Sequence, residues 1–423
     1  MGAAPPLFNL PNPHALATIV EASATRKIVA SQDIFDDRGT KLWARDQPVS
    51  HSLQQRLLER RLKQPLEACL RAADGITTVQ LHQALQAFLD SGHALAGACQ
   101  PWAGPLIDEV QRLPLHSSAQ LLLTAVHATR PQVYEHAIKG MALAGAMQAS
   151  VRNERYDLRL ALLGGLLHDL GEMYIAPQYI DGARQLDARG FRHVATHPRV
   201  GELLLASLTD YPPTLARAVG EHHERLDGSG YPMRRGGDAI SPLGRLLCVV
   251  EITLGIANSP GAPLAHASLA LRMIPGEFDG VWAGFVSAAA RQAAEDLGPA
   301  DAAASEELPL QLRALNKDLA TAHAQAEALA LRLHASRAVL DIAGHAAAAL
   351  ERLRAGWNAI GLWSAAPGDG GAESRFEIGI AATELRYRMR TIQRDCLWAR
   401  DEPSTEDSEQ LAPLWATLSG EAA

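Results

Sequence analysis

The chain has 423 residues, a formal net charge of −8 at pH 7 and 47% apolar residues. An apolar fraction of this size excludes an intrinsically disordered protein, and without a marked run of Lys and Arg a non-specific nucleic-acid binder is not expected. Aromatic residues make up only 5%, and Ala and Leu supply most of the apolar content. Because both are strong helix formers, the composition predicts a mainly α-helical protein.

The cysteines point to a reducing compartment. Cys69, Cys99, Cys248 and Cys396 are far apart, and no two of them form a CxxC pair. This pattern is typical of a protein without a disulfide framework or a thiolate zinc site. Since no stretch reaches about 18 apolar residues and the first residues lack a signal-peptide pattern, we expect a cytoplasmic protein without a membrane span.

Residues 1–110 are predicted to form a small mixed leader domain. Two β-leaning runs flank Asp37-Arg38-Gly39, which predicts a hairpin. After them, residues 50–70 are expected to form one helix with leucines along one side. These leucines are Leu53, Leu57, Leu58, Leu62 and Leu66.

Residues 111–300 are predicted to form an all-α domain of about six packed helices, because segments with helical periodicity alternate with Gly and Pro breakers. Residues 301–423 are predicted to form a helical C-terminal region. In it, apolar residues recur at alternating three- and four-residue steps from Leu312 to Leu350, which is a heptad-like seam. Two interpretations stay open: a coiled-coil homodimer through 310–350, or a long helix that packs within the monomer.

Imidazoles and carboxylates recur at unexpected places in the central domain. His168-Asp169 ends an apolar helix, Glu251 interrupts an apolar run, and His222-His223 ends another helix. An ionised carboxylate in such a setting is costly unless it is paired or binds a metal. Imidazoles and carboxylates together suit iron, manganese or zinc. The donors are sufficient for two metals that clamp a phosphoryl group.

Each of these residues also has an ordinary structural interpretation. His136 or His197 alone is more often a surface or capping histidine, and His168-Asp169 alone is equally consistent with a helix cap. Glu251 alone suits a buried salt bridge to Arg245. The segment HHERLDGSGYP at 222–232 is hard to explain by packing, and the combination of all these pieces favours a metal site.

The central region resembles the HD-GYP family of the HD phosphohydrolase superfamily. HHERLDGSGYP at 222–232 matches the signature HHExxDGxGYP at every fixed position, and HDLG at 168–171 fits the HD signature. The segments 134–136, 197–201 and 245–251 fit further ligand-bearing helices of the family. The GYP signature is long and highly specific, whereas the HD dyad alone would be weak.

The resemblance covers about residues 111–300 and implies a bacterial cyclic di-GMP phosphodiesterase. It implies hydrolysis to pGpG, and often on to GMP, by a hydroxide that bridges two divalent metals, usually Fe or Mn, with His168 and Asp169 as the catalytic pair. The metal ligands that it implies are His136, His168, Asp169, His197, His222, His223 and Glu251. The loop residues that it implies next to the substrate, or to a partner such as a diguanylate cyclase, are Asp227, Gly228, Gly230, Tyr231 and Pro232.

Several positions depart from the family pattern. Glu172 stands where the family usually has a Lys on the substrate phosphate, and Glu251 stands where it usually has Asp. Gln132 stands where members with a third metal carry Glu, so we expect two metals. The stretch 255–263 lacks the usual Arg residues. The candidates to replace them are Arg184, Arg192, Arg199, Arg234 and Arg235.

These departures keep two alternatives open. The domain is either an active phosphodiesterase or a catalytically weak module that binds a nucleotide or a partner protein. A hydrolase of another phosphoester is a further alternative. The leader at 1–110 resembles the segment found ahead of some HD-GYP domains, and its role is unknown.

Overall fold

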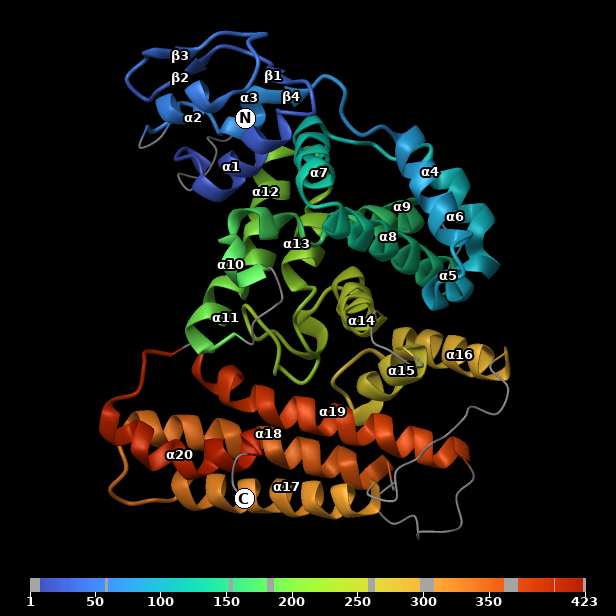
Figure 1. Ribbon diagram of the computed structural model, residues 1–423, viewed down its shortest axis with the longest axis vertical. Coiled ribbons are helices and arrows are strands. Elements are labelled where there is room, and N and C mark those ends of the chain that lie inside the picture. Colours follow the sequence, from blue (N-terminus) through green and yellow to red (C-terminus); the bar gives the residue numbers. More distant parts are fainter. Residues whose placement is uncertain are drawn as a thin grey trace. The chain divides into compact units, whose positions relative to one another are not determined.

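The computed structural model describes residues 8–57, 60–151, 155–180, 186–257, 263–296, 308–360, 372–398 and 400–420. The predicted mainly α-helical fold is confirmed, with a few short strands (Figure 1). The chain divides into two compact units. Unit 1 comprises residues 1–184 and 193–255, and unit 2 comprises residues 185–192 and 256–423. The predicted three-domain division stays a prediction.

Unit 1 contains the leader and the helices of the central domain. Its helices are α1 (Pro13–Ala22), α2 (His51–Leu57), α3 (Leu66–Cys69), α4 (Thr78–Leu89), α5 (Ala94–Cys99), α6 (Ala103–Val110), α7 (Ser117–Thr129), α8 (Pro131–Val151), α9 (Arg155–Leu167), α10 (Pro177–Ile180), α12 (His197–Leu208), α13 (Pro213–Glu221) and α14 (Pro242–Ala257). Short 3-10 helices are η2 (Gln100–Trp102), η3 (Leu170–Tyr174) and η4 (Gly237–Ala239). Helix α11 (Ala188–Val194) and the last residues of α14 cross the division between the units.

The strands lie in the leader. Strands β1 (Ile28–Ala30) and β4 (Leu70–Ala72) pair antiparallel. Strands β2 (Ile34–Phe35) and β3 (Lys41–Trp43) form the hairpin that the sequence predicts. The buried carboxylate of Asp36 closes its turn, because Oδ1 accepts the backbone N–H groups of Thr40 at 2.7 Å and Arg38 at 3.1 Å.

The predicted single helix over 50–70 is wrong. Helix α2 ends at Leu57, and the chain runs irregularly until α3 begins after Pro65. In between, the N–H of Leu62 donates to the carbonyl of Asn9 at 2.6 Å, and the N–H of Lys63 donates to the carbonyl of Phe35 at 3.0 Å. Leu58 lies outside the described residues. The described leucines of the pattern are nevertheless buried, so the periodicity marked the core correctly but not the backbone.

Helices α8 and α9 approach closely through two glycines. A Cβ atom on Gly140 would lie 2.6 Å from the carbonyl oxygen of Gly165, and one on Gly165 would lie 2.2 Å from that of Gly140. Any side chain would therefore push the helices apart. The crossing lies one turn after His136 on α8 and just before His168, so it brings these two histidines together.

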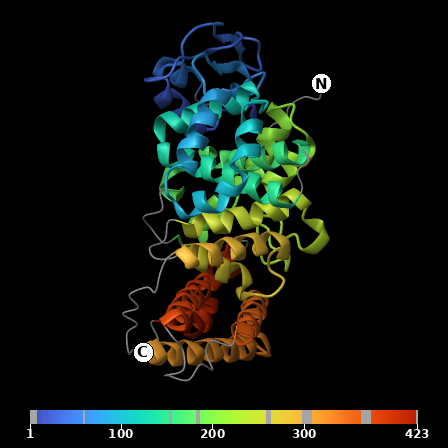
Figure 2. The ribbon, with the colours of Figure 1, turned by 90° about the vertical axis from the view of Figure 1, so that its right-hand side faces the viewer.

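Unit 2 is built mainly from the C-terminal helices (orange to red in Figure 1 and Figure 2). The helices of unit 2 are α15 (Pro263–Met273), α16 (Gly280–Asp296), α17 (Leu308–Ala330), α18 (Arg337–Ile360), α19 (Ala372–Leu397) and α20 (Thr405–Ser419). Helices α15 and α17 to α20 share a core that includes Leu319, Leu350, Trp357, Leu385 and Leu414.

The heptad-like seam does not run through one helix. The chain leaves α17 after Ala330, Leu333 is 94% exposed, and α18 begins anew. Ser336 starts the second helix, because its hydroxyl accepts the N–H of Val339 at 3.1 Å. The buried seam residues, such as Leu319 and Leu350, pack within unit 2, which agrees with the intramolecular interpretation. In the described parts of the chain, no helix has the length and apolarity that crossing a membrane requires.

Candidate metal centre

The seven side chains predicted as metal ligands converge in unit 1. They lie on α8 (His136), directly after α9 (His168 and Asp169), at the first residue of α12 (His197), directly after α13 (His222 and His223) and on α14 (Glu251). Helix ends supply most of them. Residues at a helix end can face a shared centre while the apolar helix body packs in the core, as the buried residues of α12 and α13 show.

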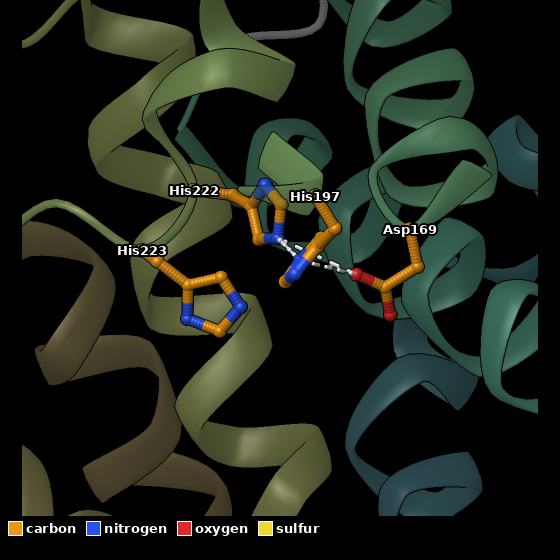
Figure 3. Close-up of side chains that lie close together, drawn as sticks. All are labelled: Asp169, His197, His222 and His223. Carbon is orange, nitrogen blue, oxygen red and sulfur yellow. Dashed lines mark hydrogen bonds and ion pairs between the residues drawn. The ribbon is translucent and has the colours of Figure 1, made fainter. Parts of the chain in front are cut away.

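Asp169 lies at the centre of the cluster and uses both carboxylate oxygens. Its Oδ1 is 3.4 Å from Nε2 of His197 and 3.4 Å from Nε2 of His222. Its Oδ2 is 3.1 Å from Nε2 of His168 and 3.3 Å from Nε2 of His136. Figure 3 shows the rings of His197 and His222 meeting at one oxygen of Asp169. Asp169 is therefore placed to bridge two neighbouring cation sites.

The donors form two groups that share Asp169: one is Asp169, His197, His222 and His223, and the other is His136, His168, Asp169 and Glu251. Within each group the ligand atoms lie within 4.8 Å of one another. Glu251 also reaches both groups: its Oε2 is 3.3 Å from Nε2 of His168, and its Oε1 is 3.9 Å from Nε2 of His223. The longer side chain of Glu, where the family usually has Asp, permits this reach. The alternative pairing with Arg245 is wrong, because that arginine pairs with Asp238 at 2.8 Å.

Backbone carbonyls fix the tautomers of three imidazoles. His168, His197 and His222 each donate Nδ1–H to the carbonyl three residues earlier, at 2.9, 2.8 and 2.6 Å. In a neutral ring the other nitrogen, Nε2, then carries a lone pair, which is the usual arrangement of a metal-binding histidine. Nε2 of His197 lies only 3.0 Å from Nε2 of His222. Two lone pairs at this distance repel unless a proton or a metal ion lies beside them.

The cluster contains buried polar atoms that the protein leaves unsatisfied. His136 Nε2, His168 Nε2 and Glu251 Oε2 are buried and make no hydrogen bond of good geometry, although they lie near oppositely charged partners. Among the described residues, neither Asp169 nor Glu251 pairs with Lys or Arg. Orphaned imidazole nitrogens around two carboxylates fit divalent cations well.

The charges of the cluster shift its pKa values in opposite directions. Burial lowers the pKa of His136, but Asp169 and Glu251 outweigh it and raise that pKa to about 9. Burial and the neighbouring His222 hold the pKa of His223 well below the usual value. The carboxylates thus attract positive charge into the cluster. Protonated histidines supply this charge when no metal is bound, and a bound metal would displace their protons.

The GYP loop is fastened to the cluster through Glu224. This buried carboxylate accepts the backbone N–H groups of Met233 at 2.8 Å and Arg235 at 2.9 Å. The ring of Tyr231 stacks on His223, with centroids 4.5 Å apart. A Cβ atom on Gly230 would lie 2.5 Å from backbone atoms of the preceding turn. Through this stacking, the GYP loop holds the ring of His223, one of the predicted metal ligands, in place.

Glu224 was not among the site residues predicted from the sequence. Its position directly after the two histidines of the signature was the available signal. The remaining predicted loop residues lie where the chain leaves His223. Asp227 caps the turn by accepting the N–H of Ser229 at 3.0 Å, Gly228 has φ 76°, and Pro232 follows Tyr231.

The positions that depart from the family lie around the cluster. Glu172 lies on η3, three residues after Asp169, and burial and the charge of Asp169 raise its pKa to about 7. Gln132 is exposed at the start of α8, one turn before His136, and belongs to neither donor group.

The arginines proposed to replace the missing phosphate contacts are engaged elsewhere or not described. Arg199 and Arg235 pair with glutamates at 2.6 and 2.7 Å. Arg192 donates to backbone carbonyls within unit 2. Arg234 belongs to the loop after Tyr231, and Arg184 lies outside the described residues.

A family model describes the region that carries the cluster. Residues 120–274 match the HD domain, a range that holds all seven donors. This segment is similar to HD domains, and its residues 222–232 resemble the HD-GYP signature. An HD domain implies a divalent metal, in agreement with the two donor groups.

The relatives of this HD domain are cyclic dinucleotide phosphodiesterases. The chain is 27% identical over 196 residues to a cyclic di-GMP phosphodiesterase of Pseudomonas aeruginosa, covering 46% of this chain and 45% of the relative. It is 36% identical over 130 residues to a 3'3'-cGAMP-specific phosphodiesterase of Vibrio cholerae, covering 30% of this chain and 26% of the relative. A cyclic di-GMP phosphodiesterase response regulator of Xanthomonas campestris pv. campestris is 30% identical over 111 residues, 26% of this chain and 29% of the relative. The chain spans less than half the length of these relatives.

Proposed function

We propose that this HD domain hydrolyses a cyclic dinucleotide, with cyclic di-GMP as the first candidate and pGpG or GMP as products, and that two divalent cations, Fe or Mn, occupy its two donor groups. One observation carries the proposal. Nε2 of His197 and Nε2 of His222 face each other at 3.0 Å beside an oxygen of Asp169. Two neutral imidazoles in this tautomer would oppose their lone pairs, so the pair needs either a shared proton or a metal cation, and a divalent cation beside Asp169 satisfies both nitrogens at once.

The residues of the chain divide the work of holding the cations. The carboxylate of Asp169 lies between the two donor groups, and Glu251 approaches both from α14. Backbone carbonyls keep His168, His197 and His222 in one orientation, so the site is prepared before a ligand binds. When bound, two such cations supply an activated water and neutralise the charge that develops on the phosphoryl oxygens.

The identity of the cyclic dinucleotide is the second part of the proposal. The relatives include enzymes named for cyclic di-GMP and for 3'3'-cGAMP, so 3'3'-cGAMP is the second candidate substrate. Glu172 in place of a lysine removes one contact to phosphate, which weakens binding and transition-state stabilisation without removing the cation site. A weakly active module that binds a nucleotide is the competing function.

The test is hydrolysis by purified protein loaded anaerobically with iron or with manganese. Cyclic di-GMP and 3'3'-cGAMP are offered separately, and metal content is measured on the same sample. His168→Ala is the blank, and His51→Ala, at an exposed histidine of the leader, is the matched control. We expect pGpG or GMP from the wild type and the control but not from the blank. No product from protein that holds two metals would favour the binding module.

Two further parts of the proposal concern the surroundings of the domain. The four cysteines are buried thiols, which supports action in the cytoplasm. The GYP loop presents Asp227 and Ser229 at its tip, and contact of this loop with a partner such as a diguanylate cyclase stays a prediction, as does a homodimer through 310–350.

A further inference from the structure

A cavity of about 620 Å³ lies in unit 1 beside the elements that carry the metal ligands. Three separate parts of the chain form its walls: α1 of the leader, the junction of α7 and α8, and α10. Its volume falls in the range of small-molecule sites. The lining residues are His14, Ala17, Thr18, Glu21, Thr129, Arg130, Gln132, Val133, Pro177 and Ile180.

Two walls of the cavity are continuous with the metal centre. Gln132 lies one helical turn before His136 on α8, and residues four apart lie on the same face of a helix. The α10 wall follows η3, which begins directly after Asp169. His136 is also the most exposed of the seven donors, at 27%. The cavity therefore adjoins the side on which the metal centre is accessible.

Arg130 supplies the cavity with a positive charge. Its Nη2 donates to the hydroxyl of Thr18 at 3.3 Å, and among the described residues it has no carboxylate partner. Thr18 is buried and donates its own hydroxyl to the carbonyl of His14 at 3.0 Å. The leader helix α1 thus orients the guanidinium and leaves most of its donors for a ligand. A guanidinium of this kind suits a phosphate group, to which it can donate two parallel hydrogen bonds.

We infer that this cavity receives the half of a cyclic dinucleotide that lies away from the scissile phosphate, with Arg130 bound to the second phosphate. This inference rests on the proposed function. A cyclic dinucleotide carries two phosphates in one ring, so a molecule held at the cations by one phosphate leaves the other phosphate and a base outside the metal centre. Arg130 then supplies the positive charge that the family's usual lysine would supply at the position of Glu172. The leader thereby becomes part of the substrate site.

The test compares a cyclic dinucleotide with a diester that has no second phosphate. Arg130→Gln removes the charge, and Ala17→Trp fills the cavity from an exposed position on α1. Arg71→Gln, on an exposed arginine of β4 outside the cavity, is the matched control. The measured quantity is kcat/KM for cyclic di-GMP divided by kcat/KM for bis(p-nitrophenyl) phosphate. We expect each cavity variant to lower this ratio about tenfold, as for loss of one charge-assisted contact, and the control to leave it unchanged.

Calorimetric titration of the metal-loaded protein with slowly hydrolysed phosphorothioate analogues of cyclic di-GMP and 3'3'-cGAMP measures binding with all seven metal ligands in place. Weaker binding in the cavity variants, with normal binding in the Arg71→Gln control, supports the inference. Equal ratios and equal affinities in all variants overturn it and leave the proposed function intact. If the wild-type domain neither binds nor hydrolyses a cyclic dinucleotide, the proposed function fails and the inference fails with it.

Discussion

Each unit buries a cluster of carboxylates and histidines, and the two clusters differ in how their charges are balanced. In unit 2, Arg388 donates to Glu277 at 2.6 Å, to Glu384 at 2.7 Å and to the carbonyl of Ala270 at 2.8 Å. The second oxygen of Glu384 lies 3.1 Å from Nε2 of His266. One guanidinium therefore pairs with both carboxylates, and each acid has a hydrogen-bond partner within the protein.

The cluster in unit 1 contains the same types of acid and imidazole but lacks the arginine. Within the described parts of the chain, the ion pairs of Asp169 and Glu251 are all with histidines, and three buried polar atoms of the cluster make no hydrogen bond of good geometry. Burial of polar groups therefore does not distinguish a functional site from a structural one. The distinguishing feature is whether the protein completes the charge and hydrogen-bond requirements itself, as in unit 2, or leaves them for a ligand.

The largest effect is expected from breaking the cluster of unit 2. Arg388→Met leaves Glu277 and Glu384 buried without their partner, which costs about 3–5 kcal/mol of unfolding free energy. Denaturant unfolding measures the loss, and Arg390→Met, at an exposed position of the same helix, is the control. Metal content should stay at the wild-type value. A variant of normal stability would show that the two buried carboxylates do not depend on Arg388.

Removing the shared carboxylate of unit 1 should have the opposite profile. Asp169→Ala is expected to lower metal affinity at least about 100-fold, because both donor groups lose a ligand at once. The metal-free protein should lose less stability than Arg388→Met does, since the substitution removes a buried negative charge together with its attraction for the histidines. Metal titration and thermal unfolding with and without chelator check both parts. Chelator should lower the Tm of the wild type and leave that of Asp169→Ala unchanged.

A smaller effect is expected from shortening Glu251. Glu251→Asp restores the usual family residue but shortens the side chain that approaches both donor groups. We expect one of the two bound metals to be held about tenfold more weakly, the lower end of the effects seen when ligand geometry is disturbed. Stepwise metal titration distinguishes this outcome from an equal loss at both sites. Unchanged metal affinity at both sites would mean that Oε1 of Glu251 takes no part in metal binding.

The sequence predicted which side chains come together in the cluster better than it predicted the backbone around them. The signature residues from His168 to His223 lie in short motifs, and the structure brings all seven predicted donors together. The helix ends near Leu57 and Ala330 were missed, because apolar spacing records burial on both sides of a break. Arg130 and Arg388 could not be identified either. Their partners, Thr18 and Glu277, are more than 100 residues away in the chain, and only folding brings them together.

The smallest predicted effect concerns a third buried polar pair, formed by Glu67 and Tyr174. Glu67 on α3 is fully buried and accepts a hydrogen bond from the hydroxyl of Tyr174 on η3. Burial raises the pKa of Glu67 above its usual value, although this hydrogen bond opposes the shift. A carboxyl group whose pKa is higher in the folded state binds its proton more tightly there, so the stability it contributes is complete at pH values below its unfolded pKa. That stability is lost as the pH rises through the folded pKa.

Glu67→Gln keeps the size and the acceptor oxygen but cannot ionise. The variant should match the wild type in Tm at pH 4 and become relatively more stable as the pH rises toward 8. Glu135→Gln, at an exposed position on α8, should show no such trend. A Tm difference between Glu67→Gln and the wild type that stays constant with pH would mean that Glu67 is ionised in the folded protein over the whole range. The pair would then resemble the metal centre, where buried negative charge needs a counterion, rather than a site completed by its own proton.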